Sequence, residues 1–138
     1  FGISKTLDDG RHLIGLTGRM KRLDSFWFAM AHEVAHILLH PKRATFIDTQ
    51  TSLANDDNDD HEGEANRYAS ELFLPIPARE KLLAAGAAAV EEIAAEVGVA
   101  PAMVAGQYAH IENAYPQMSK YRPTIDSTEL QSLQTLDL

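Results

Sequence analysis

Apolar residues fill almost the whole stretch from Phe26 to Leu39, and its only polar members are His32, Glu33 and His36. A helix that is apolar on nearly all sides is typically a buried helix. Ionisable groups inside such a helix cost several kcal/mol unless they are paired or bind a metal ion. The pattern therefore predicts a buried helix whose polar residues share a binding partner.

The chain before this helix predicts a β-hairpin over residues 1–17. Its strands are Phe1–Thr6 and His12–Thr17, and the acidic segment Asp8-Asp9-Gly10 between them is typical of a tight turn. We expect this small sheet to pack on the buried helix.

The two ends of the buried helix also have sequence signals. We expect Asp24 or Ser25 to cap its beginning and Pro41 to end it. Farther along, Ala44–Asp48 is strand-like, and the polar residues Thr49–Asp60 predict a surface loop that leads to the next helix.

Helical patterns occupy most of the remaining chain. A second helix is predicted from His61 to Leu74, and an Ala-rich helical stretch covers Pro77–Val97 with a break at Gly86. A last helix is predicted from Pro101 to about Asn113, because Pro is favourable in a first helical turn. Together with the hairpin, these elements indicate an α+β fold that is mainly helical.

The length of 138 residues suffices for one domain with a hydrophobic core. We place this domain at residues 1–113 and a C-terminal tail or extension at residues 114–138. The apolar fraction of 45% is ordinary for a soluble globular protein. No apolar run approaches the roughly 18 residues of a membrane span, so we expect no membrane partner.

Charge and cysteine content bear on where the protein is located and on which partners it binds. Cysteine is absent and no signal-peptide pattern is present, and both absences fit a cytoplasmic protein. The net charge is −8, whereas nucleic-acid-binding modules usually carry a basic face. We therefore expect no direct nucleic-acid binding by this fragment. Since the chain begins at Phe1 rather than at Met, we expect it to be a piece of a longer protein.

The polar residues of the buried helix form an HExxH motif. His32 and His36 are four positions apart, so on a helix both imidazoles can reach one metal ion. Glu33 is rotated from His32 by about 100° and is better placed to act on a water molecule as a general base than to bind the metal. We therefore predict a metal site in which Glu33 is the catalytic residue.

A catalytic zinc site usually needs a third protein ligand. The next helix offers Glu62 and Glu64, and their spacing leaves both open. Glu62 shares a helix face with Asn66, which could steady a ligand histidine, whereas Glu64 then points elsewhere. Zinc is the expected metal, and manganese or iron fit the same ligands.

Zinc peptidases often use a His or Tyr side chain to stabilise the oxyanion of the tetrahedral intermediate. His110 or Tyr108 could have that role, and we name His110 as the candidate. His40 is interpreted as a charge at the helix C-terminus rather than as a ligand.

The residues Phe26–His40 and Glu62–Pro75 together resemble the ImmA/IrrE metallopeptidase family, which pairs an AHExxHxLLH helix with a later ExEANxFAxxLLMP helix. The resemblance covers roughly residues 10–112. It implies that Glu62 is the third ligand, that Asn66 supports the site, and that Glu64 is only the alternative.

The resemblance also implies a cellular role. Members of the family are intracellular and often encoded with, or fused to, a helix-turn-helix repressor. We therefore expect a zinc endopeptidase whose protein substrate is a DNA-binding repressor, in stress response or in mobile-element or toxin–antitoxin control. Residues 90–110 also have a helix-turn-helix pattern, but they carry no basic residue between Glu91 and His110, so we interpret them as a packing element.

The alternative belongs to another function class. The domain could be a non-catalytic metal-binding sensor or dimerisation domain of a helix-turn-helix transcription regulator, and it could form a homodimer. Glu33 argues against this alternative, because a purely structural metal site gains nothing from a general base.

Overall fold

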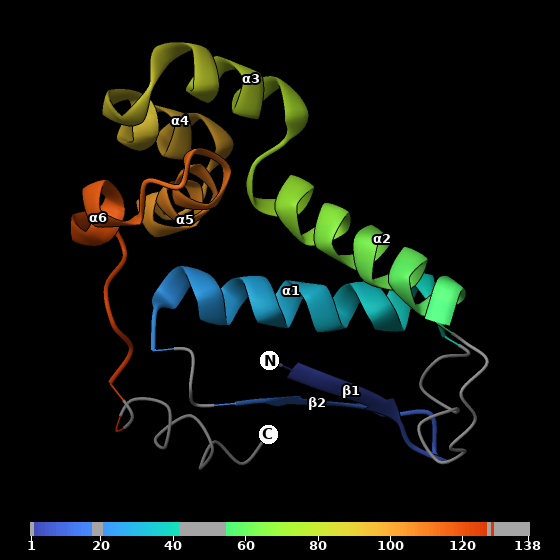
Figure 1. The fold of residues 1–138 in the computed structure, drawn as a ribbon. Helices are drawn as coiled ribbons and strands as arrows, with labels where there is room; N and C mark the ends of the chain where they lie inside the picture. The colour runs from blue at the N-terminus through green and yellow to red at the C-terminus, as the bar shows by residue number, and fades with distance from the viewer. Residues whose placement is uncertain (1, 18–20, 42–54, 127, 129–138) are drawn as a thin grey trace.

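The computed structural model describes residues 2–17, 21–41, 55–126 and 128. Six α-helices and a two-stranded sheet make up the described part, which confirms the predicted α+β fold with its mainly helical character. The sheet lies on one side of helix α1 (Leu23–Leu39), and the other helices lie on the opposite side (Figure 1).

The predicted hairpin is present at the N-terminus. Strand β1 (Gly2–Thr6) pairs antiparallel with β2 (His12–Leu16), in a register that runs from Gly2 opposite Leu16 to Thr6 opposite His12. Gly10 adopts a φ of 84° in the turn, a conformation that glycine reaches at no steric cost. Both strands contact α1, as the sequence predicted.

Helix α1 begins earlier than expected. Its N-cap residue is Arg22, which makes no side-chain capping bond, so the predicted caps Asp24 and Ser25 are wrong. The Leu23 N–H instead donates to the carbonyl of Pro123, 2.9 Å away. The backbone near Pro123, rather than a local side chain, therefore accepts a hydrogen bond from the first turn of α1.

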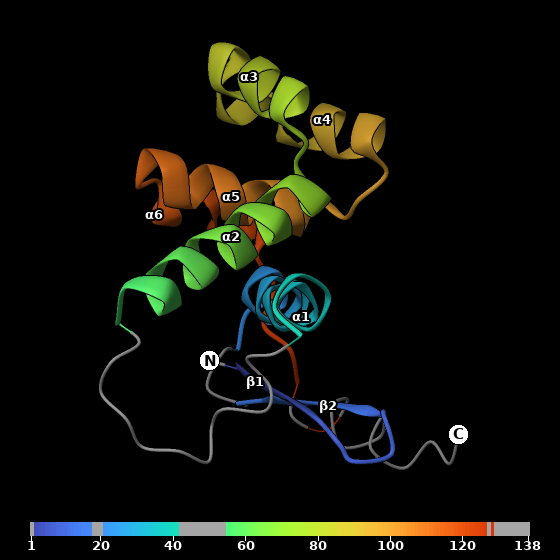
Figure 2. The same ribbon diagram turned by 90° about the vertical axis from the view of Figure 1, so that its right-hand side faces the viewer.

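Helix α2 (Asn55–Phe73) crosses over α1 (Figure 2). Its first turns occupy residues that were predicted to form a loop, and for residues 55–60 that prediction is wrong. Acidic side chains are favourable at a helix N-terminus, which explains how this polar run can be helical. The predicted strand Ala44–Asp48 and the rest of the loop lie outside the described residues.

Small side chains are buried on both helices of this crossing. Ala31 and Ala35 on α1 are 5% and 0% exposed, and Ala65 and Ala69 on α2 are both 0% exposed. Alanine allows two helix backbones to approach closely, which brings polar side chains of both helices within reach of each other.

Three further helices contribute to a buried apolar cluster. They are α3 (Ile76–Ala85), α4 (Val90–Val97) and α5 (Pro101–Glu112), with a 3-10 turn at Ala87–Ala89. The break at Gly86 is where the sequence predicted it. The fully buried members of the cluster include Leu74, Leu82, Val90, Ile93 and Val104. The apolar sides of α4 and α5 therefore face this core, in line with our interpretation of residues 90–110.

The chain after α5 returns to the body of the domain. It forms α6 (Tyr115–Met118) and a 3-10 turn at Ser119–Tyr121, and Met118 is 2% exposed. Arg122 Nε then donates to Asp24 Oδ2 over 2.9 Å. Residues 115–125 therefore pack on the domain, while the predicted domain boundary at residue 113 stays a prediction.

No helix within the described residues has the length and apolar character that a bilayer crossing requires.

Candidate metal centre

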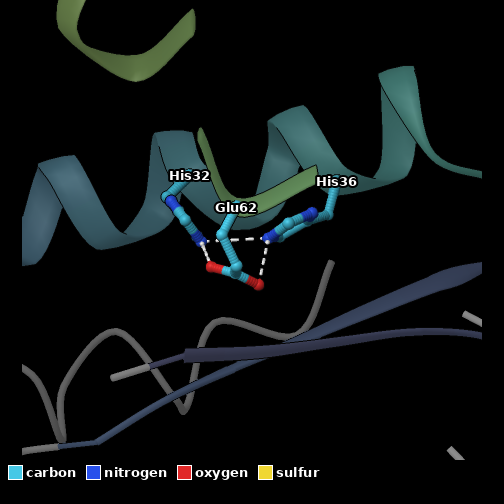
Figure 3. A group of neighbouring side chains, drawn as sticks. All are labelled: His32, His36 and Glu62. Atoms are coloured by element: carbon cyan, nitrogen blue, oxygen red, sulfur yellow. Dashed lines mark hydrogen bonds and ion pairs between the residues drawn. The ribbon is translucent and has the colours of Figure 1, made fainter. Parts of the chain in front are cut away.

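Three donor groups meet where α2 crosses α1. The Nε2 atoms of His32 and His36 lie 3.0 Å apart, on successive turns of α1. Glu62 on α2 reaches both, with Oε2 3.0 Å from His32 Nε2 and Oε1 3.3 Å from His36 Nε2. Figure 3 shows the three side chains converging from the two helices. Their donor atoms all lie within 4.8 Å of one another, a separation that a single metal ion can bridge.

The far side of the His32 ring is held by Asn66. His32 Nδ1 lies 2.9 Å from the amide oxygen of Asn66, one turn beyond Glu62 on α2. An amide oxygen only accepts, so His32 donates this hydrogen bond from Nδ1, and its Nε2 faces Glu62. The structure thus brings Asn66 to the position that the sequence reasoning gave it.

Glu64 is turned away from the three converging groups and binds His40 instead. Its Oε2 lies 2.6 Å from His40 Nε2, and His40 Nδ1 lies 3.2 Å from His36 Nδ1. The hydrogen bond from His40 holds the pKa of the Glu64 carboxyl below its usual value. Of the two carboxylates that spacing left open, the structure therefore brings Glu62 to both histidines.

The part played by His40 was missed from the sequence. We interpreted His40 as a charge at the helix C-terminus, and the structure shows that it is 6% exposed and stacks on the ring of His61 at a centroid distance of 4.0 Å. The signal that could have revealed it is the spacing, because His40 follows His36 by four residues as His36 follows His32.

The donor set fits a divalent metal ion. Two imidazole nitrogens and a carboxylate meet at 3.0–3.3 Å, and a cation shared among them would hold all three groups together. A tetrahedral zinc ion with bonds of about 2.0–2.2 Å would separate its ligand atoms by about 3.3–3.6 Å, close to these distances. Imidazole and carboxylate are also ligands that zinc, manganese and iron accept.

Glu33 lies between α1 and the hairpin rather than among the three donors. It is 6% exposed, and a Cβ atom added to Gly2 would lie 2.6 Å from its Cγ and 2.8 Å from its Oε1. The absence of a side chain at Gly2 therefore makes room for the Glu33 carboxylate at the start of β1.

The two oxyanion candidates lie in different surroundings. His110 is exposed, its Nδ1 lies 3.3 Å from the Tyr115 hydroxyl, and it lines a cavity of about 330 Å³ that Asn66 also lines. Tyr108 packs against the apolar cluster of the C-terminal helices. Of the two, His110 shares a cavity with a residue of the candidate site.

Comparison with known proteins gives one family. The model of the peptidase M78 family, described as the IrrE N-terminal-like domain, matches residues 3–106. No curated protein and no solved structure matches the chain significantly. The matched region contains the hairpin from Ile3 onward, both helices of the candidate site and the first half of α5. This chain belongs to the peptidase M78 family, as an IrrE N-terminal-like domain.

Proposed function

We propose that the protein is a zinc endopeptidase in which His32, His36 and Glu62 hold the metal and Glu33 is the general base. The main support for this proposal is that donor atoms of His32, His36 and Glu62 converge from two helices. The buried carboxylate of Glu33 directly follows His32 in the sequence. Membership in a peptidase family supports it.

Each side chain would have a separate task. Zinc, when bound, supplies a Lewis acid that polarises a peptide carbonyl and lowers the pKa of water. Glu33 accepts the proton of the attacking water and later delivers it to the leaving amine. Glu33 lies against Gly2 at the start of β1, where the missing glycine side chain leaves room for its carboxylate. His110, on the wall of the neighbouring cavity, is the candidate donor to the oxyanion.

The proposed substrate is a DNA-binding repressor. The net charge of −8 supports this choice, because DNA-binding proteins carry basic surfaces and opposite charges speed encounter. The family resemblance of the two motif helices points to the same class of substrate.

Replacement of Glu33 by Gln tests the proposal. Removal of a general base typically costs about 10²–10⁴-fold in rate, so Glu33→Gln should cleave a helix-turn-helix repressor at least about 100-fold more slowly while it still binds zinc. Glu91→Gln, which neutralises an exposed carboxylate on α4, is the matched control and should cleave at the wild-type rate.

Wild-type cleavage by Glu33→Gln would contradict the assigned base. If the wild-type protein binds zinc but leaves repressors intact, while operator binding responds to a ligand, the regulator alternative replaces the peptidase.

A further inference from the structure

A chain of three side chains runs from the candidate metal site to the surface of α2. It begins at His36, whose Nε2 faces His32 and Glu62. His36 Nδ1 lies 3.2 Å from His40 Nδ1, and His40 Nε2 lies 2.6 Å from Glu64 Oε2. The far side of the His36 ring is thus in contact with a second histidine, and that histidine with a carboxylate.

The chemistry of the carboxylate fixes the direction of each hydrogen bond. An ionised Glu64 can only accept, so His40 Nε2 carries a proton and donates it. In a neutral imidazole the other nitrogen is then an acceptor, which makes His40 Nδ1 the acceptor for the N–H at His36 Nδ1. With its donor at Nδ1, His36 can offer Nε2 to a metal ion shared with His32 and Glu62.

Packing holds the intermediate ring in place. His40 is 6% exposed, and the ring of His61 stacks on it with an angle of 27° between the planes. A ring fixed by stacking loses little entropy when it accepts a hydrogen bond, so it is a good anchor for a neighbouring side chain.

The two candidate ligand histidines are therefore anchored in different ways. His32 donates directly to the amide oxygen of Asn66, whereas His36 donates to another histidine. Glu64 determines which nitrogen of that second histidine can accept. An amide oxygen needs no such partner, because it accepts in every state.

We infer that His40 and Glu64 are positioning residues that fix the tautomer and ring orientation of His36 for metal binding. This inference rests on the proposed function, since it concerns the same metal site. Groups that orient a ligand histidine typically change metal affinity by about 10–100-fold when they are removed.

Two substitutions of His40 separate hydrogen bonding from packing. His40→Phe keeps a ring that can stack on His61 but accepts no hydrogen bond. His40→Asn places an amide oxygen near the former position of Nδ1 and keeps an acceptor. The carboxylate is tested with Glu64→Ala, which is compared with Glu91→Ala, a substitution that removes an exposed carboxylate on α4.

Two measurements on the intact chain apply to each variant: the zinc dissociation constant from chelator competition, and the tautomer of His36 in the metal-free protein from ¹⁵N NMR. We expect His40→Phe and Glu64→Ala to bind zinc about 10–100-fold more weakly and to lose the Nδ1–H form of His36. His40→Asn should bind within a few-fold of wild type, and Glu91→Ala should equal wild type.

The inference is overturned if His36 keeps its Nδ1–H tautomer in His40→Phe and Glu64→Ala, or if His40→Phe and His40→Asn bind zinc equally well. Neither result would contradict the zinc site itself. If the wild-type chain binds no zinc, the proposed function fails instead. The tautomer of His36 in metal-free His40→Phe then decides the inference alone, because it requires no metal.

Discussion

Asn66 is the residue whose contribution to the site can be isolated most simply. Its amide oxygen accepts the Nδ1–H of His32 over 2.9 Å, and Asn66 itself is exposed, so its replacement leaves little buried space. Asn66→Ala should weaken zinc binding by about 10–100-fold, because the His32 ring loses the group that orients it. Chelator competition measures this change.

Asn66→Asp is the matched control, since it keeps an acceptor oxygen at nearly the same position and should retain most of the affinity. Wild-type affinity in Asn66→Ala would show that the orientation of His32 does not depend on this hydrogen bond.

The sequence was sufficient to predict the relative positions of side chains that lie on the same helix. The spacing of His32 and His36 is sufficient to place both imidazoles on one face. The choice between Glu62 and Glu64 could not be made from spacing, because it depends on how α2 is rotated about its axis as it crosses α1. The contact between His40 and Glu64 has the same origin, and it escaped prediction for the same reason.

The contact between α1 and α5 depends on a glycine. A Cβ atom added to Gly106 would clash with the carboxylate of Asp24, which is held by Arg122. Gly106→Ala should therefore lower the free energy of unfolding by about 1–3 kcal/mol, because the ion pair or the helix must move. Urea denaturation followed by circular dichroism measures it.

Gly63 provides the opposite case on α2. A Cβ atom added there meets nothing within 4 Å, and glycine inside a helix is less favourable than alanine. Gly63→Ala should raise the free energy of unfolding by about 0.5–1 kcal/mol. Equal effects of the two substitutions would contradict the steric explanation for Gly106.

Helix ends marked by local residues were predictable, and ends set by distant contacts were not. Gly98 stops α4 in the left-handed conformation with a φ of 81°, and Pro101 begins α5. By contrast, α1 starts at Leu23 because a carbonyl from the C-terminal segment accepts its N–H. The start of α2 at Asn55 was hidden because a run of Asn and Asp suits a loop as well as a helix N-terminus.

At the scale of the whole molecule, the candidate site joins parts that are distant in sequence. The hairpin covers one side of α1 and contacts Glu33, while α2 on the other side supplies Glu62 and Asn66 (Figure 1). The α+β class was predictable from the order of the elements. The return of the C-terminal segment was not, because its ion pair joins Arg122 to Asp24 across 98 positions of the chain.

We propose that one metal ion is held between α1 and α2, and the zinc content of Glu62→Ala after dialysis tests this claim. The wild-type chain and the control Glu91→Ala should each retain one zinc ion per chain. Glu62→Ala should lose most of its zinc, since two histidines from one helix then remain as ligands. One zinc ion per chain in Glu62→Ala, bound with wild-type affinity, would contradict the claim and move the third ligand to Glu64.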